Sequence, residues 1–319
     1  MTESILLLAI GLILLSVGGE LLVRGAVGMA ARLGISPLLA GLTIVGFGTS
    51  MPELATSVQA ALAGSPGIAM GNVVGSNIAN ILLVLGVSAL IMPLVVNPAS
   101  FARDSIAMGG SALLATGAVL LGVIGWLPGV VLIAALIGYI WWAYKSESAA
   151  PCPEGARHEA EVEDHPVPPN TGPVVLVGMI IAGLTAAVFG AGYLVDGATV
   201  IASAAGVSES VIGLTVVAVG TSLPELIACV VAVLRKHGDV ALGNVVGSCI
   251  YNLCGILGAT ALITPIAVPE EIAGFDIWVM LGVTALLLVQ LRSGWRLSRI
   301  EGGLLVLLYV GYTALLAMR

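Results

Sequence analysis

The chemistry of this chain is concentrated in one short polar motif that occurs twice within apolar sequence. Gly-Thr-Ser-Met-Pro-Glu-Leu at 48–54 returns 172 positions later as Gly-Thr-Ser-Leu-Pro-Glu-Leu at 220–226. A carboxylate inside the hydrocarbon region of a bilayer is costly even once. The same acid in the same polar setting twice, as Glu53 and Glu225, therefore predicts a paired cation site in a protein that moves a cation across a membrane.

Each copy of the motif places hard oxygen ligands within one helical turn. On a helix, Thr49, Ser50 and Glu53 stand at i, i+1 and i+4, so two hydroxyls and a carboxylate share one side. Pro52 has no N–H and its ring pushes against the carbonyl of Gly48, so we expect carbonyls from Gly46 to Thr49 to lose their helical partners. The second copy supplies the equivalent set through Ala218, Thr221, Ser222 and Glu225.

A second duplicated block, Asn-Val-Val-Gly-Ser at 72–76 and 244–248, adds further oxygens. Asn80 and Asn252 each stand four residues after the serine of this block, Ser76 or Ser248. Ca²⁺ takes about six to eight oxygens, and two facing half-sites would supply carboxylate, amide, hydroxyl and carbonyl oxygens. Two carboxylates balance the charge of one Ca²⁺. Soft ligands are absent from the matched positions, which argues against zinc and copper.

Composition places the chain among polytopic membrane proteins. Apolar residues make up 59% of it and charged residues 9%, and the mean hydropathy is +1.12, far from the values of soluble domains. Apolar stretches of about 20 residues are long enough to cross a bilayer. We predict ten of them, at 4–23, 37–62, 69–93, 104–123, 127–144, 174–195, 209–234, 241–263, 274–291 and 299–317.

The motifs belong to a longer internal repeat. Aligned without a gap, residues 18–86 and 190–258 are identical at roughly 32 of 69 positions, which indicates duplication of one structural unit. Each copy holds five predicted spans, an odd number, so the second must enter the membrane opposite to the first. We therefore predict an all-α integral membrane protein of ten transmembrane helices in two inverted five-helix repeats, with a midplane site where the copies meet.

Basic residues predict the orientation of the chain. With the N-terminus outside, only Arg319 of the 11 basic residues falls outside, as the positive-inside rule requires. The Pro- and acid-rich segment 146–172 is then a disordered cytoplasmic linker between a first half, 1–145, and a second half, 173–319. Both termini would be extracytoplasmic, in the plasma or inner membrane. The N-terminus lacks a basic n-region, so we expect the first span to be retained.

Other polar residues have simpler interpretations. Glu20 stands one turn before Arg24 and is matched by Gly192 in the other repeat, so we interpret it as an interfacial ion pair rather than a transport residue. The four cysteines and three histidines match no zinc or redox spacing and are expected to have no role in chemistry. The repeated glycines and prolines could serve only helix packing.

Three classes of function fit paired acids in a membrane protein. An antiporter explains the repeat, the acids and the charge segregation together, whereas a channel explains the acids alone. An enzyme needs a nucleophile with a positioned base or a metal triad, and the sequence shows neither. We expect no enzyme activity, no prosthetic group, no nucleic acid and no obligate protein partner. The expected partners are the lipid bilayer and the transported ions, Ca²⁺ with Na⁺ or H⁺.

The blocks G-T-S-x-P-E and G-N-x-x-G-S-x-I-x-N, present in both halves, resemble the two alpha-repeats of the cation/Ca²⁺ exchanger superfamily, in particular its sodium/calcium exchanger branch. The resemblance implies ten transmembrane helices around four central ion sites, with alternating access by sliding of the first and sixth helices. The ion ligands it implies are the Gly46 carbonyl, Thr49, Ser50, Glu53, Ser76, Asn80, Ala218, Thr221, Ser222, Glu225, Ser248 and Asn252.

One position departs from that resemblance. Sodium/calcium members similar to this chain carry Asp where Asn252 stands, so the centre here has two acids instead of three. Two carboxylates neutralise one Ca²⁺, two Na⁺ or two H⁺, and a third Na⁺ would leave an uncompensated charge. The proton/Ca²⁺ branch tends to carry an acid and a histidine after its G-N block, which 74–76 and 246–248 do not match. We therefore favour Na⁺ as counter-ion, with H⁺ as the alternative.

Overall fold

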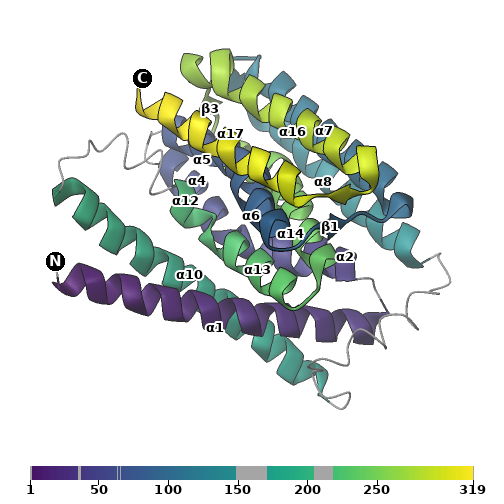
Figure 1. The fold of residues 1–319 in the computed structure, drawn as a ribbon. Coiled ribbons are helices and arrows are strands. Elements are labelled where there is room, and N and C mark those ends of the chain that lie inside the picture. The colour runs from purple at the N-terminus through teal and green to yellow at the C-terminus, as the bar shows by residue number, and fades with distance from the viewer. Residues whose placement is uncertain are drawn as a thin grey trace.

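The structure, a computed structural model, describes residues 2–34, 37–62, 64, 66–148, 171–204 and 218–318. The described part is helical apart from short connections and four two-residue strands (Figure 1). Helix α8 continues to Ser148, so the first three residues of the predicted linker at 146–172 belong to this helix. The hydroxyl of Ser146 bonds back to the carbonyl of Trp142 at 2.8 Å in this last turn. Residues 149–170 lie outside the described part.

The described residues of the first half form eight α-helices, two π-helical segments and two strands. They are α1 (Thr2–Leu33), α2 (Pro37–Ala40), η1 (Gly41–Val45), α3 (Gly46–Thr49), α4 (Met51–Leu62), α5 (Pro66–Ala79), η2 (Asn80–Leu85), α6 (Gly86–Ile91), β1 (Leu94–Val95), α7 (Pro98–Val119), β2 (Val123–Ile124) and α8 (Trp126–Ser148).

The described residues of the second half follow a similar order, with a π-helical segment added between β3 and α16. They form α10 (Pro173–Ala204), α12 (Ala218–Thr221), α13 (Leu223–Leu234), α14 (Gly238–Ile250), η5 (Tyr251–Ile256), α15 (Leu257–Ile263), β3 (Ile266–Ala267), η6 (Ile272–Asp276), α16 (Ile277–Gly294), β4 (Arg296–Leu297) and α17 (Arg299–Ala317).

Six described helical segments are long and apolar enough to cross a membrane. They are Pro66–Ile91, Trp126–Ser146, Pro173–Gly190, Gly238–Ile263, Ile272–Gly294 and Arg299–Leu316. Each overlaps one of the ten predicted spans. Part of another predicted span, at 209–217, lies outside the described residues, so the count of ten and the inverted arrangement stay predictions.

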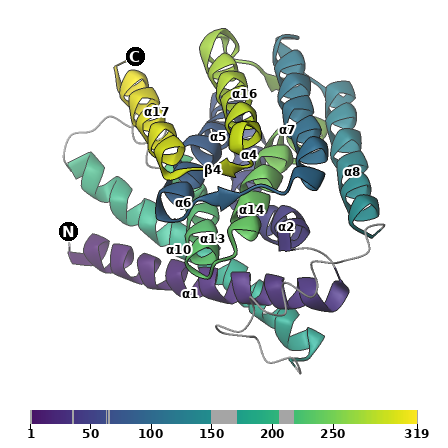
Figure 2. The same cartoon turned by 45° about the vertical axis from the view of Figure 1, so that its right-hand side comes forward.

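Helices α1 and α10 lie along each other on one side of the molecule, and α7, α8, α16 and α17 lie on the other (Figures 1 and 2). The elements that carry the duplicated motifs are between these two groups. Glycines allow the α1–α10 contact: a Cβ on Gly18 would lie 2.8 Å from the backbone nitrogen of Ala187, and one on Gly183 would lie 2.6 Å from that of Leu22. Backbones approach this closely only where the side chain is absent.

The two halves are also joined by their short strands. β1 pairs antiparallel with β4, with Leu94 opposite Leu297, and β2 pairs antiparallel with β3, with Ile124 opposite Ile266. In both ladders a strand of one half pairs with a strand of the other. The halves are therefore joined at two places, and among the described residues neither half forms a sheet by itself.

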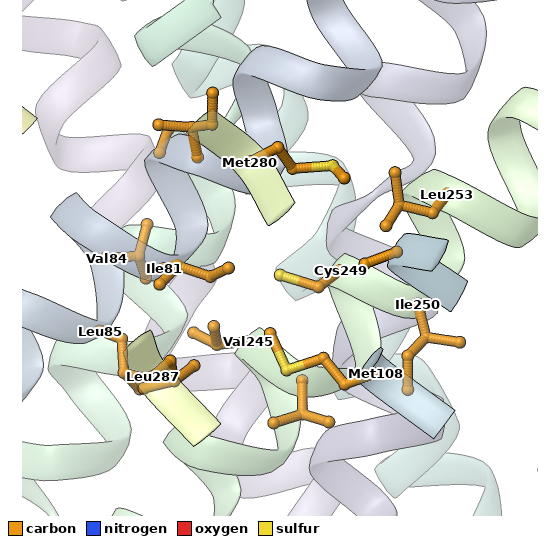
Figure 3. Packing of buried hydrophobic residues seen from close by; sticks show 14 of the residues in the cluster. Ile81, Val84, Leu85, Met108, Val245, Cys249, Ile250, Leu253, Met280 and Leu287 are labelled. Carbon is orange, nitrogen blue, oxygen red and sulfur yellow. The ribbon is translucent and has the colours of Figure 1, made fainter. Parts of the chain in front are cut away.

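The buried core lies where the middle elements meet the outer helices. Figure 3 shows Ile81 of η2, Met108 of α7, Cys249 of α14 and Met280 of α16 gathered around one packed region. These four side chains are each 1% exposed or less. Because side chains from both halves share this core, burial fixes the position of one half against the other.

A pair of polar side chains recurs at corresponding places in the two halves. Tyr139 of α8 donates a hydrogen bond to Asp104 of α7 at 3.2 Å, and Tyr312 of α17 donates one to Asp276 of η6 at 2.9 Å. Arg103, predicted at the edge of a cytoplasmic loop, is 5% exposed and its Nε lies 2.7 Å from Asp104 Oδ1. The last two helices of each half are thus joined by an acid–tyrosine contact.

Candidate ion-binding site

The two copies of the duplicated motif meet inside the protein. In each, the helix is interrupted just before the proline, at Ser50 (φ −83°, ψ 5°) and at Ser222 (φ −87°, ψ 4°). The helix carrying the acid begins immediately after, as α4 or α13. Glu53 and Glu225 therefore lie in the first turn of a helix, and both are 0% exposed.

Each acid is hydrogen-bonded by a serine of the opposite half. The hydroxyl of Ser50 donates to Glu225 Oε1 at 3.2 Å, and the hydroxyl of Ser222 donates to Glu53 Oε1 at 3.4 Å. The sequence predicted that each serine would share a half-site with the acid of its own motif. The two half-sites were predicted to face each other, and in the structure each serine bonds the acid of the other motif, so these bonds join the half-sites.

The second duplicated block lies beside these motifs on α5 and α14. Asn72 and Asn244, which the sequence analysis did not include among the ligands, bond to both motifs. Thr221 donates to Asn72 Oδ1 at 3.3 Å, and Thr49 donates to Asn244 Oδ1 at 3.3 Å. The signal that could have identified them is their exact repetition 172 positions apart, next to a predicted ligand block.

Several predicted ligands carry buried polar atoms that have no hydrogen-bond partner among the described residues. Of the ten such side-chain atoms, seven belong to Glu53, Ser76, Asn80, Glu225 and Asn252. An apolar interior makes an unsatisfied polar atom expensive. Two of these atoms are carboxylate oxygens, and η2 and η5, which carry Asn80 and Asn252, contact the acid-bearing helices α13 and α4. Unsatisfied oxygens of this kind suit a cation.

Asn80 and Asn252 owe their position to local distortions of the helix. Asn80 is the first residue of η2 and Asn252 the second of η5, both short π-helical segments. Such segments are frequent at functional sites because they change the direction in which a side chain points. The sequence predicted apolar spans at 69–93 and 241–263 but did not indicate either π-helical segment.

The remaining predicted ligands have mixed outcomes. Gly46 was expected to have a freed carbonyl, but its oxygen accepts the backbone N–H of Ser50 at 3.2 Å, so this expectation is wrong. Pro52 lacks the N–H that would bond the carbonyl of Gly48, whereas the N–H that bonds the carbonyl of Gly46 belongs to Ser50. The hydroxyl of Ser248 also donates to the Gly46 carbonyl, at 3.4 Å. Ala218 begins α12, and residues 205–217 before it lie outside the described part.

The described residues contain no group of three or more His, Cys, Asp or Glu side chains that could hold a metal ion. A cation between Glu53 and Glu225 would therefore rest on two carboxylates and neutral oxygens. This donor set suits a hard ion such as Ca²⁺ or Na⁺. Cys229, Cys249 and Cys254 are buried free thiols, and Cys152 lies outside the described part.

Glu20 lies away from this centre, as predicted. It forms an ion pair with Arg24 one turn later in α1 and a second with Arg235 at the end of α13. Arg235 Nε also donates to Glu20 at 3.2 Å. The pairing with Arg24 is confirmed, and the contact with Arg235 joins the first helix to the opposite half, which the sequence did not indicate.

The fold and the centre define a multi-helix membrane protein with two buried acids shared between duplicated halves. The family model described as sodium/calcium exchanger protein matches residues 3–145 and 175–318. The chain belongs to this family of membrane exchangers.

Individual relatives cover almost the whole chain. It is 34% identical to the sodium/calcium exchanger MaX1 of Methanosarcina acetivorans, over 99% of both chains. It is 34% identical to the inner membrane protein YrbG of Escherichia coli, over 98% of this chain and 95% of that one. The solved structure of the sodium–calcium exchanger NCX_Mj soaked with Na⁺ and Sr²⁺ matches with a TM-score of 0.82 and 33% identity, over 98% of both chains.

Proposed function

We propose that the protein is a secondary active antiporter that exchanges Ca²⁺ for Na⁺ across a membrane. The observation that carries this proposal is the shared centre: two fully buried carboxylates, each hydrogen-bonded by a serine of the opposite half, among unsatisfied buried oxygens. The likeness to MaX1 and NCX_Mj supports Na⁺ and Ca²⁺ as the two ions.

The charges at the centre supply a reason for exchange. Two ionised carboxylates buried without a cation carry a large desolvation cost. One Ca²⁺ or two Na⁺ would neutralise them, so the same oxygens bind either Ca²⁺ or Na⁺ but not both at once. If the centre changes sides only when its charge is neutralised, movement of one ion in one direction requires the other ion to return.

The ligands of this proposal are the predicted positions other than Gly46, whose carbonyl already accepts the N–H of Ser50. Ala218 would contribute its carbonyl. The predicted topology is part of it: ten transmembrane helices, halves at 1–145 and 173–319, a cytoplasmic linker at 146–172, and both termini extracytoplasmic in the cell membrane. The extended contact between α1 and α10 supports movement of these two helices together past the elements that carry the ligands.

Exchange of Ca²⁺ for H⁺ is the second candidate, because two carboxylates that bind Ca²⁺ also take two protons with the same charge balance. Purified protein in liposomes distinguishes the two. We expect uptake of ⁴⁵Ca²⁺ when an outward Na⁺ gradient is imposed, and none when only a pH gradient is imposed. Uptake driven by the pH gradient alone would favour protons, and uptake without either gradient would contradict antiport.

A further inference from the structure

Asn72 of α5 contacts both halves of the proposed ion site. It is 7% exposed, and its Nδ2 donates to the backbone carbonyl of Glu53 at 3.0 Å and to the hydroxyl of Ser57 at 2.9 Å, both on α4. Its Oδ1 accepts from Thr221 of the opposite half at 3.3 Å. One side chain therefore holds the helix that carries an acid and reaches a threonine of the other half.

Asn244 of α14 repeats this arrangement. It is 0% exposed, and its Nδ2 contacts the carbonyl of Glu225 at 3.4 Å and the sulfur of Cys229 at 3.1 Å, both on α13. Its Oδ1 lies 3.3 Å from the hydroxyl of Thr49 of the opposite half, which has the carbonyl of Val45 as a second acceptor at 3.0 Å. The two asparagines thus make corresponding contacts in opposite directions across the interface between the halves.

The chemistry of the partners fixes the direction of these hydrogen bonds. A backbone carbonyl can only accept, so the amide NH₂ of Asn72 must face Glu53 and its oxygen must face Thr221. The threonine hydroxyl must then donate to the asparagine. A hydroxyl whose proton is engaged in this way keeps its lone pairs for another partner, which is the orientation that a cation ligand needs.

We propose that Asn72 and Asn244 are positioning residues that couple the two halves of the ion site. Each holds the first turn of the acid-bearing helix in its own half and orients the hydroxyl of Thr221 or Thr49 in the other. A movement of either half then changes the positions of ion ligands in both halves. This inference rests on the proposed function, because it assigns a role to residues around the same ion site.

The hydrogen bonds that hold the two asparagines differ in strength. Asn72 Nδ2 has two oxygen acceptors, whereas Asn244 Nδ2 has a longer bond to the carbonyl and a sulfur, which is a weak acceptor. Cys229 stands where Ser57 stands in the first half. The orientation of Thr221 is therefore better fixed than that of Thr49, and loss of Asn72 has the larger effect.

Double-mutant cycles on equilibrium ⁴⁵Ca²⁺ binding to the purified protein test this coupling. Asn72→Ala should lower Ca²⁺ affinity by about tenfold, the effect of one lost buried hydrogen bond. In a Thr221→Val background the same change should cost less than about threefold, because the hydroxyl it orients is gone. In a Thr49→Val background, the matched control with no bond to Asn72, it should still cost about tenfold.

Equal costs of Asn72→Ala in the two backgrounds would overturn the coupling. Absence of Ca²⁺ binding by the unmodified protein would instead overturn the proposed function. If Asn72→Ala does not fold, Cys229→Ser provides the test, because a better acceptor holds Asn244 more firmly. It should raise Ca²⁺ affinity about twofold, with no gain in the Thr49→Val background; an unchanged affinity, or an equal gain in both backgrounds, would overturn the proposal.

Discussion

Replacing Glu225 by glutamine removes one of the two buried charges at the proposed site and little else. Gln has nearly the same shape, and its carbonyl oxygen can still accept the hydroxyl of Ser50, which now bonds Glu225 Oε1 at 3.2 Å. Glu53→Gln is the equivalent change in the first half, where Ser222 bonds the acid at 3.4 Å. The variants therefore report on charge more than on packing.

The size of the effect follows from electrostatics in a buried site. Two unit charges about 4 Å apart interact by about 4 kcal/mol at an effective dielectric constant of about 20. A divalent ion doubles this to about 8 kcal/mol. Removing the charge also makes the ion-free site easier to bury. If this offsets half of the lost attraction, the Ca²⁺ binding free energy is weakened by about 4 kcal/mol, roughly a thousandfold in affinity. For Na⁺ the same reasoning leaves about 2 kcal/mol, roughly thirtyfold.

Equilibrium ion binding and thermal unfolding in detergent check this prediction. Both Gln variants should lose the stabilisation that Ca²⁺ gives the unmodified protein, and without ions neither should unfold at a lower temperature, since a buried charge has been removed. Glu301→Gln is the matched control: Glu301 caps α17, a role that Gln also fills, and Ca²⁺ affinity should not change. Unchanged Ca²⁺ affinity of Glu53→Gln, or equal losses for Ca²⁺ and Na⁺, would refute the reasoning.

Three further predictions concern other parts of the chain. Asn252→Asp, which adds a third acid, should raise the number of Na⁺ exchanged per Ca²⁺; reversal potentials showing three Na⁺ per Ca²⁺ in the unmodified protein would contradict the charge balance. Deleting 150–168, within the predicted linker, should leave ⁴⁵Ca²⁺ flux in liposomes nearly unchanged, and a loss of flux would mean that the segment takes part in transport. Gly183→Ala should destabilise the protein by about 1–3 kcal/mol in thermal unfolding through the α1–α10 contact, whereas Gly178→Ala on the same helix, with nothing within 4 Å of its Cβ, should not.

The sequence determined the local features of this protein. The repeat, the apolar spans and the two acids were evident from residue types and spacing, and the helices are interrupted beside the duplicated prolines, Pro52 and Pro224. These features depend on the chemistry of a few neighbouring residues. Proline lacks an N–H wherever it stands, and a carboxylate in apolar sequence needs a partner whatever the fold.

The tertiary structure decided which residues meet. The sequence grouped Ser50 with Glu53 of its own motif and did not indicate its hydrogen bond to Glu225 of the other half. It also gave no reason to pair Asn72 with Thr221, or Glu20 with Arg235. Periodicity relates positions within one helix, whereas these contacts depend on how the halves are set against each other.

That setting comes from close backbone packing. A Cβ on Gly247 of α14 would lie 2.4 Å from the carbonyl oxygen of Leu42, so the glycine allows α14 to approach the segment before the first motif. The π-helical segments that contain Asn80 and Asn252 were likewise not evident from residue pattern, because such a distortion is a small local cost that neighbouring helices can outweigh. The sequence therefore specified the ligand types, and packing between the halves determined the site they form.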